Sequence, residues 1–205
     1  MRDQPKLIVW DFDGVLNANI RNGRLFWADA MTADLGVPVE AFTAHFFASG
    51  LFNRIVRGEL DLRDALWQWL DGIDTDVSAD AFLHYWLSHD AHPDSEVIGW
   101  LRGHPARHVI GTNNEPYRAA FIEKDMGFAD VVEHIFASGR MGVAKPQEAF
   151  FRQVEDWASL PPANILLVDD TLGNIEACQS FGWRGFHFTP QTRSELPALL
   201  GVAAT

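Results

Sequence analysis

The chain opens, after a few polar residues, with a continuous run of apolar side chains at Leu7–Trp10. A run without alternation between apolar and polar positions is typical of a central parallel strand that is covered on both faces. Similar runs recur later in the chain, and the last of them is weaker: 107–111, 132–136, 165–168 and 185–188. We expect each of these runs to form a strand.

Helix-length segments separate the later runs. They cover residues 116–126, 147–157 and 174–181, and Gly127 and Gly182 stand where helices commonly end. Strands that alternate with helices predict an α/β protein with a doubly wound, mostly parallel sheet. In such a sheet, ligands bind beyond the carboxyl ends of the strands.

Residues 17–92 do not follow this alternation. They contain amphipathic helical patterns and no convincing strand, and the predicted helices are 25–35, 39–47, 62–70 and 79–87. Asp61 and Ser78 can cap the last two helices, while Gly36 and Gly72 mark helix ends. We therefore predict a small all-helical cap domain at 17–92, inserted after the first strand into a core domain formed by residues 1–16 and 93–205. This position would make the cap a lid over the carboxyl end of that strand.

Composition narrows the class of protein. Of the 205 residues, 47% are hydrophobic and 21% are charged, which is typical of a folded globular chain. No apolar run approaches the roughly 20 residues of a membrane helix, so we expect a cytoplasmic protein without a membrane partner. The net charge of -12 and the lack of any Lys/Arg cluster argue against a nucleic-acid partner. The single cysteine, Cys178, excludes an intramolecular disulfide and is expected to be a buried thiol.

Four sets of chemically capable residues follow the predicted strands. They are Asp11 with Asp13, Thr112 with Asn113, Lys145, and Asp169 with Asp170. Each set alone has an ordinary structural explanation, such as an acidic turn, a capped loop, a solvated lysine or a helix N-cap. Their common position at the carboxyl edge of a parallel sheet favours a site instead. Acids, a hydroxyl and an amine together can bind Mg²⁺ and a phosphate group.

With these motifs in this order, the sequence resembles the haloacid dehalogenase-like superfamily. The four family motifs are similar to residues 7–16, 110–112, 145–146 and 166–170, and the helical insertion resembles the family's first type of cap. Residues 57–61, Arg-Gly-Glu-Leu-Asp, resemble a small turn common in this subgroup. The resemblance spans nearly the whole chain and implies a Rossmann-like core.

The resemblance also implies roles for the motif residues. Asp11 would be the nucleophile that forms an aspartyl-phosphate, and Asp13 would be the general acid and base. The expected substrate-binding residues are Thr112, Asn113 and Lys145, of which Thr112 and Lys145 also belong to the catalytic set. The cofactor would be Mg²⁺, held by Asp11, Asp13, Asp169 and Asp170. Which of Asp169 and Asp170 contacts the metal directly stays open at this point.

Asp13 favours one activity within the family. Dehalogenases that the sequence resembles have another residue two places after the nucleophile, because a leaving halide needs no proton. The sequence therefore predicts a phosphoric monoester hydrolase that acts on a small phosphorylated metabolite such as a sugar phosphate. Phosphomutase and 2-haloacid dehalogenase activities are the alternatives in the same superfamily. A non-catalytic phospho-accepting or binding module is the alternative from another class, and the oligomeric state stays open.

Three further groups of residues lie outside the four motifs. Histidines 84, 89 and 92 lack the spacing of a zinc site. The aromatic residues at positions 67, 69, 85 and 86 are expected to pack within the cap. Cap arginines that could reach a substrate are Arg21, Arg54 and Arg57.

Overall fold

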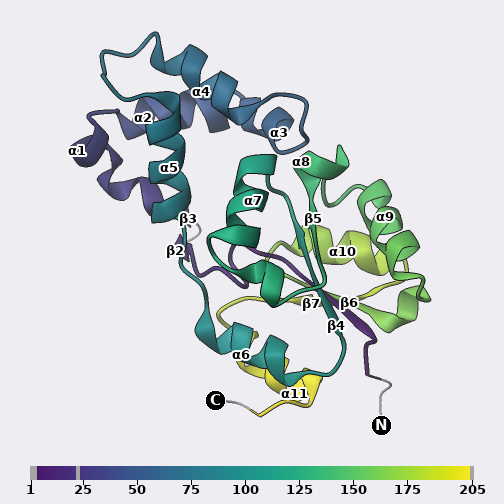
Figure 1. Cartoon of the computed structure of the whole chain (residues 1–205). Coiled ribbons are helices and arrows are strands. Elements are labelled where there is room, and N and C mark those ends of the chain that lie inside the picture. Colours follow the sequence, from purple (N-terminus) through teal and green to yellow (C-terminus); the bar gives the residue numbers. More distant parts are fainter. Residues whose placement is uncertain (1–3, 22–23, 204–205) are drawn as a thin grey trace.

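Five parallel strands form the central sheet of the protein (Figure 1), in the spatial order β5-β4-β1-β6-β7. The computed structural model describes residues 4–21 and 24–203, and of residues 21, 24 and 25 it describes the backbone alone. The strands are β1 (Leu7–Trp10), β4 (Arg107–Thr112), β5 (His134–Ala137), β6 (Ile165–Asp169) and β7 (Arg184–His187). The predicted α/β class and parallel sheet are confirmed, with strand ends within two residues of those expected.

The register of the three middle strands brings their carboxyl ends level. Trp10 in β1 lies opposite Ile110 in β4 and Val168 in β6. The residues that follow Trp10 therefore emerge beside those that follow Ile110 and Val168. This is the edge at which the sequence analysis expects a site.

Alternate residues of the sheet face two layers of helices. Ile8 and Trp10 pack with α6 (Ser95–Gly103), α7 (Pro116–Lys124) and α11 (Leu196–Leu200). On the opposite face, Leu7 and Val9 pack with α9 (Glu148–Ala158) and α10 (Leu172–Ser180), which contributes the buried Cys178. All four β1 side chains are fully buried, as the continuous apolar run predicted.

The segment between β1 and α6 forms a body of short helices at the upper left of Figure 1. Its helices are η1 (Trp27–Ala30), α1 (Met31–Leu35), α2 (Val39–Phe42), the π-helix η2 (Thr43–Ala48), α3 (Leu51–Ile55), α4 (Leu62–Leu70) and α5 (Ala79–His89). The predicted N-caps are present, because Asp61 accepts from Asp64 N at 3.0 Å and Ser78 accepts from Ala81 N at 3.2 Å. Gly36 ends α1 in the left-handed conformation, with φ of 67°.

Two expectations for this segment are wrong. A short antiparallel pair, β2 (Ile20–Arg21) and β3 (Arg24–Leu25), occupies the region expected to be free of strands. The helix expected from residue 25 therefore begins only at Trp27. The intervening Asn-Gly dipeptide at positions 22 and 23 is a common hairpin signal, but strands of two residues are too short to show a period of two.

The helical body has a hydrophobic cluster of its own. Trp27 stacks on Trp86 with ring centroids 4.8 Å apart, and Phe42, Phe46 and Phe82 lie fully buried or nearly so in the same cluster. This cluster draws on residues 27–87 and on Tyr117 of the core, whereas the two core clusters draw on residues 7–16 and 97–202. The exact boundaries of cap and core stay a prediction. None of the helices described is long and apolar enough to cross a membrane.

The cap also touches the core away from its two linkers. Ser138 Oγ donates a hydrogen bond to the carbonyl oxygen of Val56, and Tyr117 Oη donates to Asp61 Oδ2 at 2.9 Å. Gly58, with φ of 72°, approaches so closely that a Cβ there would lie 2.3 Å from the carbonyl oxygen of Gly139. The turn at residues 57–61 is thus seated directly on the core.

We predict that Gly58→Ala lowers the free energy of unfolding by more than Gly50→Ala does. Both glycines have φ near 75°, so alanine costs about 1–2 kcal/mol at either position through backbone strain alone. A Cβ at Gly50 meets nothing within 4 Å, whereas a Cβ at Gly58 would clash with the core. Urea denaturation of the two variants measures the difference, and equal losses would contradict a cap seated on residue 139.

Candidate active site

Residues that follow β1, β4 and β6 at the carboxyl edge of the sheet meet residues of the cap around one cavity of about 270 Å³. Of the residues predicted from the sequence, those that line it are Asp11, Asp13, Thr112, Asn113 and Asp170. The remaining two, Lys145 and Asp169, are fully or almost fully buried beside Asp11. The structure therefore brings the whole predicted set together.

Lys145 lies between two of the acids. Its Nζ is 3.0 Å from Asp11 Oδ1 and 2.6 Å from Asp169 Oδ2. Burial alone would lower the pKa of Lys145, but the two carboxylates raise it to about 12. The lysine is consequently a permanent buried cation next to the predicted nucleophile.

Asp169 and Asp170 differ in how far their oxygens are engaged. Asp169 accepts from Lys145 Nζ, from Thr171 N at 2.9 Å, and from Asn174 Nδ2 at 3.0 and 3.1 Å. Asp170 accepts from Thr171 Oγ1 at 3.2 Å and lines the cavity, where its Oδ2 would be 2.4 Å from a Cβ on Gly14. Asp169 is thus held from several sides, and the carboxylate of Asp170 is less engaged.

Three carboxylates form a group suited to a metal ion. One oxygen each from Asp11, Asp169 and Asp170 lie within 4.8 Å of one another. Burial raises the pKa of Asp11 well above its usual range, and the charge of Asp169 adds to this effect while Lys145 opposes it. Hard oxygen ligands and an excess of negative charge are what a divalent cation such as Mg²⁺ requires. The donor set fits the predicted cofactor.

Two neighbouring amides organise the end of β4. Asn114 Nδ2 donates to Thr112 Oγ1 at 2.8 Å, which leaves the hydroxyl proton of Thr112 free to donate into the cavity. Asn113 instead joins the loop of Lys145, because its Oδ1 accepts from Lys145 N at 2.9 Å and its Nδ2 donates to Lys145 O at 2.8 Å. Asn113 was expected to bind substrate; it lines the cavity, and its side chain also holds the lysine loop in place.

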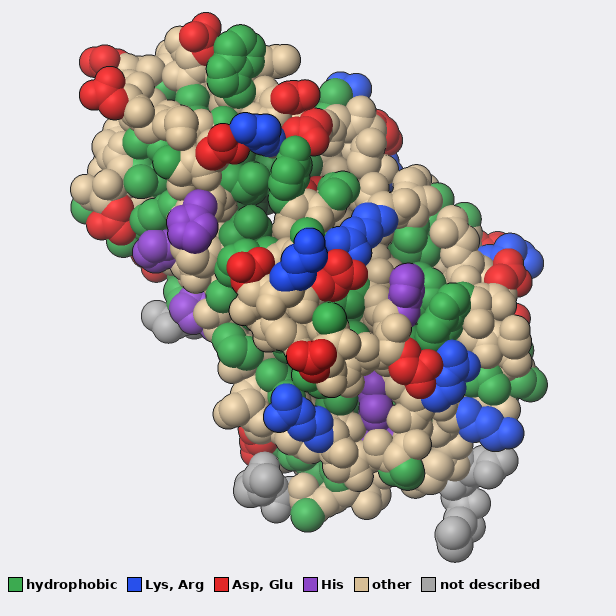
Figure 2. Space-filling model, in the orientation of Figure 1, with side chains coloured by type: hydrophobic (Ala, Val, Ile, Leu, Met, Phe, Trp, Pro, Cys, Tyr) green, Lys and Arg blue, Asp and Glu red, His purple; other side chains and the backbone are tan. Residues whose placement is uncertain are grey.

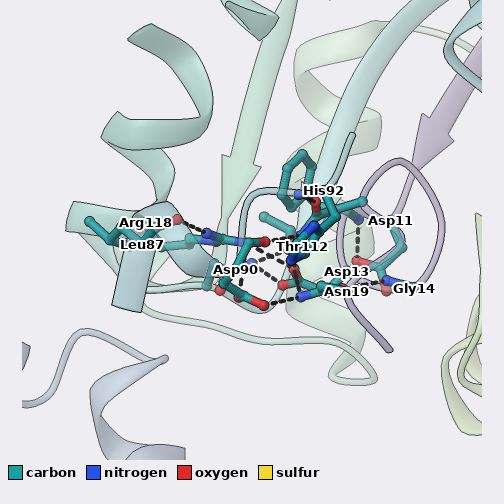
Figure 3. Close-up of polar contacts among 12 residues, drawn as sticks. Asp11, Asp13, Gly14, Asn19, Leu87, Asp90, His92, Thr112 and Arg118 are labelled. Atoms are coloured by element: carbon teal, nitrogen blue, oxygen red, sulfur yellow. Dashed lines mark hydrogen bonds and ion pairs between the residues drawn. The ribbon is translucent and has the colours of Figure 1, made fainter. Parts of the chain in front are cut away.

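Asp13 is held by four side chains that donate to its two oxygens (Figure 3). Its Oδ1 accepts from Asn17 at 3.2 Å, from Asn19 at 2.8 Å and from Arg118 at 3.3 Å. Its Oδ2 accepts from Asn114 Nδ2 at 2.8 Å. Asn17 and Asn19 belong to the linker that enters the cap, so the carboxylate is oriented by both the core and this linker.

Arg118 and Asp90 extend this network to the linker that leaves the cap (Figure 3). Arg118 NH2 is 2.9 Å from Asp90 Oδ2 and donates to the carbonyl oxygen of Asp90 at 3.0 Å. Its NH1 donates to the carbonyl oxygen of Leu87 at 3.2 Å. Burial raises the pKa of Asp90 to about 7, although the adjacent guanidinium acts in the opposite direction. Glu115 caps α7 by accepting from two backbone N–H groups and so fixes the helix that carries Arg118.

Sequence reasoning did not single out Arg118, Asp90, Asn17 or Asn19. A buried arginine inside a helix has the same sequence appearance as an exposed one, and only the fold shows its partners. The available signal was the two asparagines close behind the Asp11–Asp13 motif, since buried amides need partners.

The other residues singled out in the sequence lie mostly away from the cavity. Arg54 and Arg57 both pair with Glu59, at 3.3 and 2.7 Å, and neither lines the cavity. The side chain of Arg21 lies outside the described residues. Trp69, Tyr85 and Trp86 pack within the cap as predicted, but Trp86 also lines the cavity and Trp67 is 64% exposed. Among the described residues, no metal-binding group includes a histidine.

The protein is of the α/β class, with an acid-rich cavity beneath a helical cap. Comparison with known proteins identifies the family. The model of the haloacid dehalogenase-like hydrolases matches residues 5–182. The chain belongs to this family, as its motifs predicted.

Two curated fungal proteins match part of the chain. Sesquiterpene phosphatase astK from Aspergillus oryzae is 36% identical over 74 residues, which are 35% of this chain and 38% of that protein. Drimenol cyclase drtB from Aspergillus calidoustus is 36% identical over 84 residues, which are 38% of this chain and 16% of that protein. The chain thus spans well under half the length of either relative.

Solved structures share the fold over nearly the whole chain. A HAD-like hydrolase from Porphyromonas gingivalis has a TM-score of 0.77 at 16% identity, covering 96% of this chain and 98% of that one. A HAD family enzyme from Bacteroides thetaiotaomicron, in complex with magnesium and inorganic phosphate, has a TM-score of 0.71 at 18% identity and covers 90% and 94%. L-2-haloacid dehalogenase from Xanthobacter autotrophicus has a TM-score of 0.63 at 20% identity and covers 94% and 82%.

We predict that Asp90→Asn gains stability relative to the wild type as pH rises. With a pKa of about 7 in the folded state and 3.8 as its ordinary value, Asp90 binds an extra proton in the folded state between these pH values. The stability that this extra proton contributes is fully present below pH 3.8 and is lost as pH rises from there to about 7. The loss is at most about 1.4 kcal/mol per pH unit. Asparagine cannot titrate. Thermal melts without metal from pH 5 to 8 measure the difference, and a constant difference would refute the expectation.

Proposed function

We propose that the protein is a magnesium-dependent phosphatase that hydrolyses a small phosphorylated metabolite through an aspartyl-phosphate on Asp11. The observation that carries the proposal is the pairing of Asp11 and Asp13 in one cavity. The first carboxylate is next to a buried lysine, and the second is oriented by four donors. A nucleophile and a separate proton donor are the two groups that this reaction requires.

The metal would be held by Asp11, Asp170 and the backbone carbonyl of Asp13. Asp169, whose oxygens are engaged by Lys145, Thr171 and Asn174, would orient these groups. When bound, Mg²⁺ neutralises charge that gathers on the transferring phosphoryl group. The magnesium and phosphate complex of the Bacteroides thetaiotaomicron enzyme supports this cofactor.

In the first step an oxygen of Asp11 attacks phosphorus. Asp11 Oδ1 accepts from Phe12 N at 2.7 Å and from Lys145 Nζ at 3.0 Å, so Oδ2 is the attacking atom we assign. The Asp11–phosphorus bond forms as the ester P–O bond breaks, and Asp13 gives its proton to the departing alcohol oxygen. The Thr112 hydroxyl and Lys145 stabilise the phosphoryl oxygens.

In the second step water attacks the phosphorus of the aspartyl-phosphate. Asp13, now ionised, takes a proton from that water, and the bond between Asp11 and phosphorus breaks to release inorganic phosphate. The four donors around Asp13 keep its side chain oriented between the two steps. The cap, seated on the core, limits the access of bulk water.

The hydrogen bonds of Asp13 favour a phosphatase over the alternative activities. A dehalogenase needs no proton donor, so a carboxylate held by four donors favours phosphoryl chemistry even though a dehalogenase shares the fold. The partial match to a sesquiterpene phosphatase also supports a phosphatase. A phosphomutase would use the same core residues. A non-catalytic phospho-accepting or binding module would have no use for an oriented Asp13.

The proposed partner is a small molecule, and a sugar phosphate is the example that the sequence analysis favoured. On the face drawn in Figure 2, Lys and Arg side chains are dispersed among acidic ones rather than gathered in one patch. No extended basic surface of the kind that nucleic acid requires lies on that face.

Asp11→Asn should abolish the hydrolysis of p-nitrophenyl phosphate, with kcat lowered roughly 10⁴-fold or more. The amide is a poor nucleophile and a poor metal ligand. Wild-type activity should require added Mg²⁺ and disappear with a chelator. The matched control is Asp156→Asn, an exposed residue of α9, which should keep full activity. Substantial turnover by Asp11→Asn would disprove the mechanism.

A further inference from the structure

The part of the cavity that faces the cap is apolar. The cap side chains that line it are Ile20, Phe52, Leu62, Trp86 and Leu87. Phe52 and Trp86 pack against each other with ring centroids 5.6 Å apart. Asp90, at the end of α5, is the acidic residue on this side, and it already pairs with Arg118 and Asn19.

Several polar side chains on the core side of the cavity already have hydrogen-bond partners within the protein. Asn113 binds the Lys145 loop, Asn114 binds Asp13 and Thr112, and Asn174 binds Asp169. Arg118 pairs with Asp13 and Asp90. Sugar hydroxyls placed against the apolar cap side chains would lose water without gaining hydrogen-bond partners, which is unfavourable. Hydrocarbon placed against Phe52, Trp86 and Leu87 would gain from leaving water.

We propose that the alcohol part of the substrate is a hydrocarbon. The substrate is then the monophosphate of an aliphatic alcohol, saturated or unsaturated, with its phosphoryl group at Asp11 and its carbon chain against Phe52, Trp86 and Leu87. This proposal rests on the proposed phosphatase function and deepens it. A cavity of about 270 Å³ is near the lower end of ligand-pocket volumes, which suits a short or compact chain.

A chain-length series tests the proposal on the whole protein with Mg²⁺. We expect kcat/KM to rise about fourfold for each added methylene from methyl to butyl phosphate, and further towards octyl phosphate until the cavity is filled. Glucose 6-phosphate should be a poorer substrate than butyl phosphate. A kcat/KM that is independent of chain length, or that is highest for glucose 6-phosphate, would overturn the hydrocarbon assignment while leaving phosphatase activity intact.

Binding of non-hydrolysable sulfonates separates this assignment from the proposed reaction. Butanesulfonate and octanesulfonate present an anion and a chain but cannot be hydrolysed. Tighter binding of octanesulfonate in calorimetry, in a protein that hydrolyses no phosphate ester, would support the apolar site and refute the phosphatase. Equal binding of the two sulfonates would contradict the apolar site whether or not the protein hydrolyses esters.

Variants of the cavity wall test which residues cause the dependence of kcat/KM on chain length. Phe52→Asn should lower kcat/KM for octyl phosphate about tenfold and lower it much less for methyl phosphate. The matched control Trp67→Asn changes an aromatic residue that is 64% exposed on the same cap and lies off the cavity, so both substrates should be unaffected. If Phe52→Asn does not fold, Leu87→Asn changes a second, half-buried residue of the wall and should have the same selective effect. Equal losses on octyl and methyl phosphate in both wall variants would contradict the proposal.

Discussion

The site depends on how the protein offsets the repulsion between carboxylates at one edge of the sheet. Three of them, Asp11, Asp169 and Asp170, have oxygens within 4.8 Å of one another. Like charges this close are costly unless a cation lies between them. Lys145 provides that cation from inside the protein, with Nζ at 2.6 and 3.0 Å from two of the acids. The remaining negative charge is what a divalent metal would neutralise.

A network of hydrogen bonds and ion pairs connects the site to the cap. Asp13 accepts from Asn17 and Asn19 on the entering linker, and Arg118 joins Asp13 to Asp90 on the leaving linker. Any rotation of the cap about its linkers would therefore change the hydrogen bonds of the proposed proton donor. The same geometry places apolar cap side chains on one side of the cavity and the carboxylates of the candidate site on the other. Recognition of the alcohol and chemistry at phosphorus are in this way assigned to different parts of one cavity.

The sequence predicted those features that depend on local pattern. The run Leu7–Trp10 predicted β1, because a central strand is apolar on both faces, and the acids behind it predicted where the candidate site lies, because ligands bind beyond the carboxyl ends of such strands. The N-caps Asp61 and Ser78 could also be predicted, because capping depends only on a few neighbouring residues.

Features that depend on distant partners were not predictable. The Arg118–Asp90 pair joins residues from different elements, and neither residue type shows its burial in the sequence. The hydrogen bonds of Asn113 to the backbone of Lys145 were not predictable for the same reason, because the two residues are 32 positions apart. The two-residue strands β2 and β3 were missed because they are too short to show a period. Which cap side chains face the cavity, such as Phe52 and Leu87, also became known only from the packing of the short helices.

The central claim is that Asp11 accepts a phosphoryl group beside a metal, and beryllium fluoride, which mimics a phosphoryl group on a carboxylate, tests it most directly. The measurement is the melting temperature of the wild-type protein and of Asp11→Asn with Mg²⁺, with and without beryllium fluoride. Because a ligand that binds only the folded state raises its stability, we predict a clear upward shift for the wild type with both components. No shift is expected for the variant. An unchanged wild-type melting temperature at saturating beryllium fluoride, or an equal shift in Asp11→Asn, would contradict the account.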